Sequence, residues 1–139
     1  MPISYILLVN KQGQTRLAQY TTFTPLKTRT TLEAEIIRRC LSRTEDQCAF
    51  LSYDGMKVIY RRYASLFFIV GVTPDENELS ILEFIHCLVE TFDQYFENVC
   101  ELDVMFNLDR AYWIVEEMVQ NGVVVEANKD NILEPLRLM

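Results

Sequence analysis

Apolar and polar positions along the first twenty residues predict a β-hairpin. Ile3 to Val9 form an apolar run, and residues 14–20, "QTRLAQY", mix polar and apolar side chains as a half-exposed strand does. Between them "NKQG" supplies a turn that ends in Gly13. Two strands joined by a short turn therefore open the fold.

A one-faced helix is predicted next. Thr24 is followed by Pro25, which indicates an N-cap with proline at the first helical position. From there to Arg43 the apolar side chains recur at roughly helical spacing, at Leu26, Leu32, Ile36, Ile37, Cys40 and Leu41. The charged residues of this segment fall on the opposite side and are expected to face outward.

Three further strands are predicted over residues 47–53, 56–63 and 65–72. Asp54 and Gly55 separate the first two and tolerate the positive φ angles of a type I′ turn. The last, "SLFFIVGV", is apolar without alternation, which predicts cover on both of its faces. The element order ββ-α-βββ therefore predicts a mostly antiparallel sheet of about five strands.

Helices are predicted for the rest of the chain. Pro74 and the acidic residues around it indicate a helix start, and a long helix follows from Leu79 to Phe96. Its apolar positions cover more than one stripe of the helix surface. One face is expected to pack on the sheet, and the surplus of apolar side chains is expected to need another neighbour. Residues 101–122 predict a short turn and a further helix, and residues 128–139 a brief helix or tail.

Length and charge limit the classes of function that the protein could have. A chain of 139 residues, half of them apolar, predicts one domain over residues 1–139. Residues 1–62 carry ten Lys+Arg against five Asp+Glu, whereas residues 63–139 carry three against fifteen, so the net charge of −7 hides two different surfaces. An acidic chain without aromatic-basic interleaving is a poor nucleic-acid binder. No signal-peptide pattern and no membrane-length apolar run is present, so a soluble protein is expected.

The sequence contains no recognisable catalytic motif. The four cysteines have no C-x-x-C spacing and the chain holds one histidine, so no structural zinc is expected and the cysteines are interpreted as reduced, buried residues of a cytosolic protein. Phosphate-binding, nucleotide-binding and hydrolase motifs are missing. His86 beside Cys87 leaves a small thiol enzyme as a remote alternative, although helical packing explains both better. No cofactor is expected, and the basic groups Arg16, Lys57, Arg61 and Arg62 indicate a binding surface.

Several stretches resemble the small (sigma) subunits of the heterotetrameric adaptor protein complexes of vesicle coats. They are "NKQGQTRLAQY", "VIYRRYASLFF" and the long run from "DENELSILEFIH" through "VCELDVMFNLD" to "EEMV". The resemblance covers almost the whole chain, and "NKQGQTRL", "CLSR" and "MFNLD" are most like the sigma subunit of adaptor complex 4. It implies a longin-like (SNARE-like) α+β fold, a five-stranded antiparallel sheet packed between helices, in agreement with the elements above.

The resemblance also implies a function without enzymatic chemistry. The chain would stabilise an adaptor complex and help to recognise cargo tails with an acidic dileucine signal, [DE]-x-x-x-L-[LI]. Arg16 would lie beside the acidic residue of the signal. The two leucines would enter a pocket lined by Tyr63, Ala64, Leu66, Val89, Asn98, Val99, Leu102 and Val104. Val104 stands where many relatives have leucine or isoleucine, so one subsite would be wider.

Partners and location follow from the same resemblance. The chain would bind a large adaptin, of the epsilon type, in a heterotetramer with a second large chain and a medium (mu) chain. It would reach trans-Golgi network and transport-vesicle membranes from the cytoplasm, and only through the complex. A sigma subunit of a clathrin-associated complex, or the zeta chain of coatomer, is the alternative within this class. Arg61 and Arg62 are expected to face acidic groups of the large chain or cargo.

Overall fold

The computed structural model describes residues 3–21, 24–42, 50–63, 65–97, 99 and 101–120. Their elements follow in the order β1 (Ile3–Asn10), β2 (Thr15–Tyr20), α1 (Leu26–Leu41), β3 (Phe50–Tyr53), β4 (Met56–Tyr63), β5 (Leu66–Val72), α2 (Glu78–Phe96), α3 (Glu101–Phe106) and α4 (Leu108–Gln120). The predicted order ββ-α-βββ is confirmed, and so are the long helix after it and the further helix within residues 101–122.

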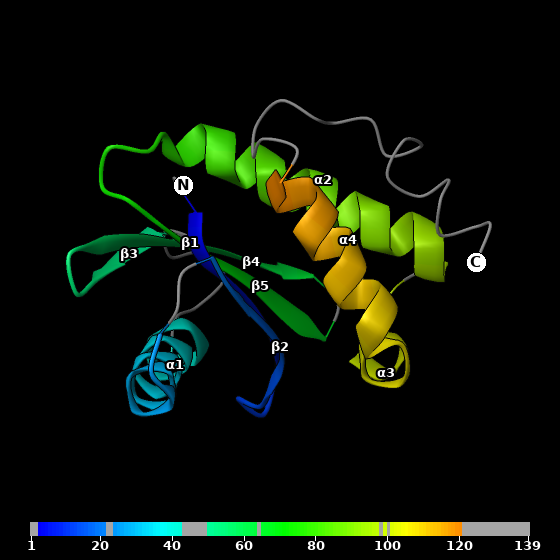
Figure 1. Cartoon of the computed structure of the whole chain (residues 1–139), viewed down its shortest axis with the longest axis horizontal. Helices are drawn as coiled ribbons and strands as arrows, with labels where there is room; N and C mark the ends of the chain where they lie inside the picture. Colours follow the sequence, from blue (N-terminus) through cyan, green and yellow to red (C-terminus); the bar gives the residue numbers. More distant parts are fainter. Residues whose placement is uncertain are drawn as a thin grey trace.

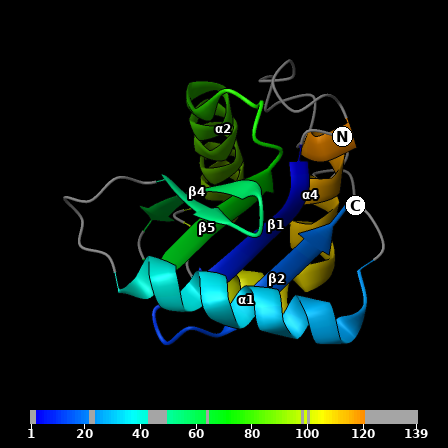
Figure 2. The same cartoon turned by 90° about the vertical axis from the view of Figure 1, so that its left-hand side faces the viewer.

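The five strands form one antiparallel sheet in the order β2-β1-β5-β4-β3. Because β2 and β3 are the two outer strands, the connection between them must cross the whole sheet, and α1 makes this crossing on one face (Figure 2). Helices α2 and α4 lie on the other face, and α3 lies beside β2 (Figure 1). The sheet is therefore packed between helices.

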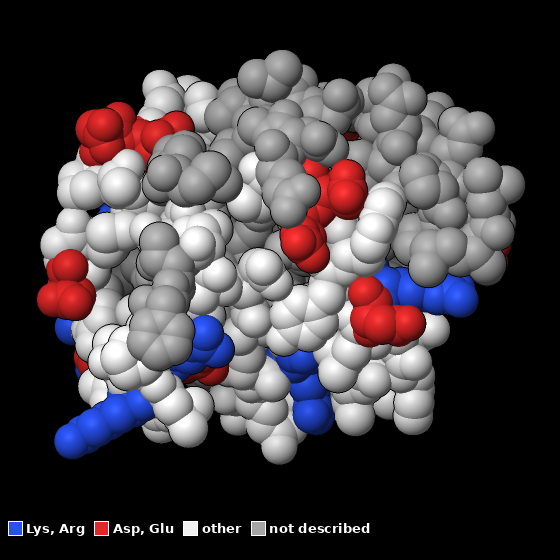
Figure 3. All heavy atoms as spheres, viewed as in Figure 1, with Lys and Arg blue, Asp and Glu red and all other residues white. Residues whose placement is uncertain are grey.

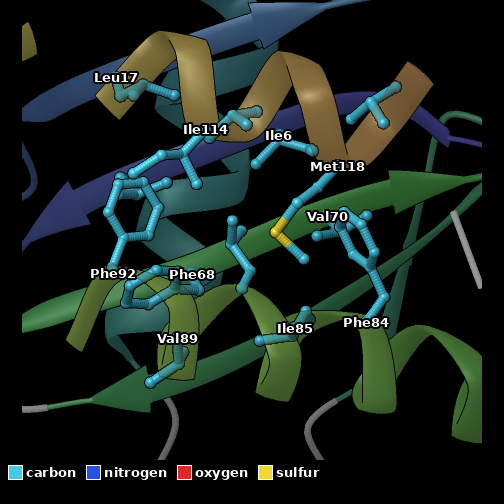
Figure 4. Packing of buried hydrophobic residues seen from close by; sticks show 14 of the residues in the cluster. Ile6, Leu17, Phe68, Val70, Phe84, Ile85, Val89, Phe92, Ile114 and Met118 are labelled. Carbon is cyan, nitrogen blue, oxygen red and sulfur yellow. The ribbon is translucent and has the colours of Figure 1, made fainter. Parts of the chain in front are cut away.

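Two apolar clusters fill the space on the two sides of the sheet. The larger lies between the sheet and helices α2 and α4, and Phe68 and Phe92 are among its largest fully buried side chains (Figure 4). The smaller lies between the sheet and α1, where Ile36, Ile37 and Cys40 pack. Every residue of β5 is buried. This confirms the prediction that the strand without alternation is covered on both faces.

The β3–β4 turn has the predicted geometry. Asp54 has a φ of 52° and Gly55 a φ of 78°, as the two central residues of a type I′ turn require. Residues 47–49 of the predicted strand lie outside the described residues, as does the segment after Gln120.

The start of α1 differs from the prediction by one residue. Pro25, not Thr24, occupies the N-cap position, and no side chain caps the helix. The reason is visible in the backbone, because the Pro25 carbonyl accepts the first helical hydrogen bond from the Arg29 N–H. The Thr24 carbonyl instead accepts a hydrogen bond from Arg29 Nε at 3.1 Å.

Helix α2 ends at Phe96 as predicted but begins one residue earlier, and α3 takes the place of a predicted turn. Asn77 caps α2, with its side-chain oxygen accepting hydrogen bonds from the N–H groups of Leu79 (2.8 Å) and Ser80 (3.2 Å). The predicted turn after residue 100 is a short helix, α3. It ends at Phe106. The next residue, Asn107, donates its side-chain N–H to the Asp103 carbonyl, and its own carbonyl accepts the first hydrogen bonds of α4.

The apolar surplus on α2 is covered in part by the chain itself. α2 and α4 contact each other, and buried residues of both belong to the larger cluster. The apolar pattern predicts only that this surplus needs another neighbour, because the packing of two helices on one face cannot be deduced from the pattern of either helix alone. Large apolar side chains that stay exposed are Leu26, Leu41, Leu79, Leu102, Met105, Phe106 and Leu108.

Candidate functional site

Four of the predicted pocket residues meet in the larger apolar cluster. Leu66 begins β5, Val89 lies on α2, Val99 precedes α3 and Val104 lies on α3, and their exposed fractions are 0, 5, 2 and 0%. Val89 lies close to Phe68 and Phe92 at one end of the cluster (Figure 4). Tyr63, at the end of β4, is half-buried and packs against the same cluster. The fold thus brings together residues from five separate segments.

Of the other predicted pocket residues, Leu102 is not part of this buried cluster. Leu102 is 57% exposed, because two residues along a helix turn the side chain to nearly the opposite side and Val104 takes the inward position. Ala64 and Asn98 lie outside the described residues. Among the residues that the structure describes, the buried walls are formed by Leu66, Val89, Val99 and Val104.

Arg16 occupies an irregular position on the edge strand β2. Leu8 pairs with Leu17 and Val9 pairs with Thr15, so Arg16 is an extra residue in a β-bulge. The bulge breaks the usual alternation, because Leu17 packs in the larger cluster while Thr15 reaches α1 and donates a hydrogen bond to Glu33. Arg16 Nη2 donates to Gln14 Oε1 at 2.9 Å. Its strand contacts α3, which carries part of the pocket wall.

Asp93 connects the pocket residues to one another, and sequence analysis did not single it out. Its Oδ1 accepts a hydrogen bond from the Val99 N–H at 2.9 Å. Interaction with the Asp93 carboxylate also raises the pKa of the Tyr63 hydroxyl. An acid on a helix surface is usually solvated, and only the fold of the segment after α2 turns Val99 back towards it. No sequence pattern predicts that contact.

Basic residues on β4 have partners within the chain. Arg61 Nη1 lies 3.3 Å from His86 Nδ1, and His86 Nε2 is paired with Glu90. Arg62 lies over the ring of Phe67 at 5.9 Å. Lys57 forms an ion pair with Glu78 of 2.9 Å and donates to the Glu76 carbonyl, which ties β4 to the start of α2. These contacts leave the expected role of Arg61 and Arg62 towards a large chain or cargo as a prediction.

The thiol-enzyme alternative gains no support from this geometry. Both ring nitrogens of His86 face Arg61 and Glu90, so the imidazole is not positioned as a base for Cys87. Cys40 is buried and Cys87 is half-buried. Among the residues described by the structure, no group of three His, Cys, Asp or Glu side chains could hold a metal ion.

Both acidic and basic side chains lie on the face shown in Figure 3. In Figure 3, Asp and Glu side chains lie near Lys and Arg side chains, and the basic ones are mostly on the side of α1 and β2. No described helix is both long and apolar enough to cross a membrane.

Comparisons with known proteins agree with this arrangement. The sequence profile of the family "Clathrin adaptor complex small chain" matches residues 2–139. The chain is 60% identical to the AP-4 complex subunit sigma of Arabidopsis thaliana over 139 residues, which is 100% of this chain and 97% of the relative. It is 53% identical to the human AP-4 complex subunit sigma-1 over 137 residues, 99% of this chain and 95% of the relative.

More distant relatives come from other complexes. The AP-1 complex subunit sigma-1 of Schizosaccharomyces pombe is 44% identical over 133 residues, which cover 96% of this chain and 82% of the relative. A chain in a homology model of the full-length AP-3 complex in a stretched open conformation superposes with a TM-score of 0.79 at 31% identity, over 98% of this chain and 92% of that one.

The fold and the comparisons therefore lead to the same family assignment. The longin-like sheet between helices is the fold expected for the family, and the match extends over nearly every residue. The chain belongs to the family of clathrin adaptor complex small chains, and it is a sigma subunit of an adaptor complex that acts with large and medium chains in vesicle-mediated protein transport.

Proposed function

We propose that this sigma subunit belongs to an adaptor complex of the AP-4 type and helps to sort cargo from the trans-Golgi network towards endosomes. The identities of 60% and 53% to sigma subunits of AP-4 complexes, against 44% to one of an AP-1 complex, support this type. Its partners are then an epsilon-type large chain, a second large chain and a mu chain. It meets the membrane only through that complex, and it performs no enzymatic reaction itself.

We further propose that the chain binds the acidic dileucine signal, [DE]-x-x-x-L-[LI], of cargo tails. The convergence of Leu66, Val89 and Val104 from three elements into one apolar cluster is the observation that supports this most directly. Branched aliphatic walls suit leucine side chains, each of which contributes roughly 1.5–3 kcal/mol when fully buried. Arg16, on its bulge beside α3, adds a weaker and salt-sensitive contact to the acidic residue of the signal.

The complex type is tested by capture of the large chain. The chain is co-expressed with one candidate large adaptin at a time, and the material bound to it is identified by mass spectrometry. Stable capture of the epsilon-type chain is expected. Capture of a large chain of a clathrin-associated complex, or of coatomer, would contradict the AP-4 assignment and place the subunit in that coat.

Signal binding is tested on the assembled complex. A synthetic peptide with an acidic dileucine signal is titrated against the parent complex, and a peptide with both leucines replaced by alanine is the control. Val89→Asp is expected to abolish binding, because it places a charge in an apolar wall. Arg16→Ala is expected to weaken binding a few-fold, with the loss shrinking at high salt. Equal binding of the two peptides would contradict the proposal.

A further inference from the structure

The turn between β1 and β2 is organised by one buried side chain. Asn10 is 1% exposed, and its Oδ1 accepts hydrogen bonds from the backbone N–H groups of Gln12 (3.0 Å) and Gln14 (2.8 Å). The backbone N–H of Asn10 donates to the Gln14 carbonyl, and its carbonyl accepts the Gly13 N–H. An asparagine side chain that bonds the backbone a few residues ahead stabilises a turn. The backbone that leads to Arg16 is therefore held in place from within the core.

The same asparagine fixes the orientation of the Gln14 side-chain amide. Because Asn10 Oδ1 accepts two backbone N–H groups, the other end of its amide is the donor Nδ2, which donates to Gln14 Oε1 at 2.9 Å. Arg16 Nη2 donates to the same oxygen, also at 2.9 Å. Both neighbours are donors and need an acceptor at that position, so the Gln14 amide cannot be turned end for end. The Gln14 oxygen is therefore occupied by contacts within the protein.

The Gln14 Nε2 group, in contrast, is a donor without an acceptor. The Gln14 side chain is exposed, and within the part of the chain that the structure describes its Nε2 group has no hydrogen-bond partner. This group lies next to the Arg16 guanidinium, because one amide carries both Nε2 and the oxygen to which Arg16 donates. A neutral and a charged donor are thus held together. A carboxylate has two oxygens and accepts several hydrogen bonds, so it can bind both donors at once.

Helix α1 holds the strand on the other side of Arg16. Thr15 Oγ1 donates to Glu33 Oε1 at 2.9 Å, and the Tyr20 hydroxyl donates to Glu33 Oε2 at 2.7 Å. Both oxygens of one α1 carboxylate therefore bind β2, one before and one after the bulge that contains Arg16. The paired donors of Gln14 and Arg16 accordingly lie on a backbone that is fixed by Asn10 at one end and by Glu33 at the other.

We propose that Gln14 is a second recognition residue for the acidic residue of the cargo signal, and that its Nε2 group donates to the carboxylate that Arg16 binds. This inference rests on the dileucine function proposed above. Gln14 acts in two ways, because its Oε1 orients Arg16 and its Nε2 contacts the signal. A guanidinium that is already held in one geometry loses less side-chain entropy on binding. A neutral donor strengthens the contact without adding to its salt dependence.

Peptide titration on the assembled complex tests this role. One peptide carries the acidic dileucine signal, and in the second the acidic residue is replaced by alanine. Gln14→Ala is expected to weaken binding of the acidic peptide about threefold and to leave binding of the second peptide unchanged. Gln12→Ala is the matched control, because it removes an exposed glutamine from the same turn, and no change is expected for either peptide. Equal weakening of both peptides by Gln14→Ala would mean that Gln14 only stabilises the turn, and would overturn the proposal.

Arg16→Ala complexes separate direct contact from orientation. If Gln14 donates to the acidic residue itself, Gln14→Ala weakens binding of the acidic peptide about a further twofold in complexes that already carry Arg16→Ala. This loss is expected to persist at high salt, whereas the loss caused by Arg16→Ala shrinks. Binding of the double variant that equals binding of Arg16→Ala would show that Gln14 acts only through Arg16, and the direct contact would be wrong.

Chemical modification tests the paired donors without a peptide. Phenylglyoxal modifies arginine side chains, and mass spectrometry of the digested subunit gives the rate at Arg16. Gln14→Ala is expected to raise this rate about twofold, because the guanidinium loses a hydrogen bond, and Gln12→Ala is expected to keep the parent rate. Equal rates in all three complexes would overturn the contact between Gln14 and Arg16. If the rates differed as expected but the parent complex bound neither peptide, the dileucine function would be wrong, and the paired donors would lose their proposed ligand.

Discussion

The hydroxyl of Tyr5 lies in the core without a hydrogen-bond partner among the described residues. The side chain is 3% exposed, and among the described residues its hydroxyl is the buried side-chain polar atom without a hydrogen-bond partner. Burial raises the pKa of this hydroxyl far above its ordinary value, with Cys40 and Tyr53 adding to the effect. Tyr20, 5.8 Å away between ring centroids, donates instead to Glu33 at 2.7 Å. The two neighbouring tyrosines therefore differ in hydrogen bonding: the Tyr20 hydroxyl has a partner, and the Tyr5 hydroxyl has none among the described residues.

Tyr5→Phe is expected to stabilise the protein by about 1 kcal/mol, because an unpaired buried hydroxyl is removed. The gain should grow above about pH 10, where an unfolded tyrosine ionises and the folded one resists, so that the parent loses stability as the pH rises. Chemical denaturation at pH 7 and pH 10.5 measures both effects. Tyr20→Phe is the control and should destabilise; a destabilised Tyr5→Phe would show that the hydroxyl has a favourable contact.

Gly71 is required by the same tyrosine. The two residues pair across β1 and β5, and a Cβ built on Gly71 would lie 2.1 Å from Tyr5 Cζ. Gly71→Ala is therefore expected to destabilise the protein by about 2 kcal/mol or more through overpacking. In a Tyr5→Ala background the ring is gone, and the added cost should fall below about 0.5 kcal/mol. Equal costs in the two backgrounds, measured by urea denaturation, would contradict this contact.

At the scale of elements, the junction between β4 and α2 depends on an ion pair. Lys57 of β4 and Glu78 of α2 are 2.9 Å apart, and the hydrogen bond from Lys57 holds the pKa of Glu78 below its ordinary value. A lowered pKa means that this contribution is fully present above about pH 4.3, where an unfolded glutamate is ionised, and is lost as the pH falls through the folded pKa.

Glu78→Gln should consequently lower the melting temperature at pH 7 and differ less from the parent as the pH falls below about 4. Melting followed by circular dichroism at pH 3, 5 and 7 measures this convergence. Glu83→Gln removes an exposed acid from the same helix and serves as the control, for which a constant difference is expected. A Glu78→Gln difference that did not change with pH would mean that the ion pair does not stabilise the junction.

The elements were predictable where local pattern decides structure. The type I′ turn at Asp54 and Gly55, and the double cover of β5, follow from residue preference and from missing alternation, and both predictions are confirmed. The N-cap of α1 and the break between α3 and α4 at Asn107 were not predicted, because several residues at each place could begin or end a helix. The bulge at Arg16 depends on pairing with β1 and has no local signal.

For the whole molecule, exposed apolar residues have a measurable consequence. Phe106 is 77%, Leu26 79% and Leu79 70% exposed, which is costly for a chain that works alone. The isolated chain is expected to self-associate as its concentration rises, whereas the chain assembled with its large partner stays monodisperse. Light scattering after size exclusion distinguishes the two. A stable monomer of the isolated chain at high concentration would contradict obligate assembly.

The proposed site could be predicted only in part, because a resemblance to a family transfers residue positions but not their conformation. It carries over residues that match position by position, and the fold places Leu66, Val89, Val99 and Val104 together as such residues require. It gives no conformation, so the burial of these walls had to come from the structure. Asp93 was missed because its role depends on a contact with the backbone of Val99, which no side-chain pattern records.

The strand order affects how the chain emerges during synthesis. β1 is an inner strand, but its second neighbour, β5, begins more than fifty residues after β1 ends. At roughly 5–20 residues per second, the nascent hairpin therefore waits on the order of seconds with one apolar edge unpaired. Unpaired edges invite pairing with other chains. Newly made subunits should accordingly depend on chaperones until residue 72 has left the ribosome, before any partner chain is needed.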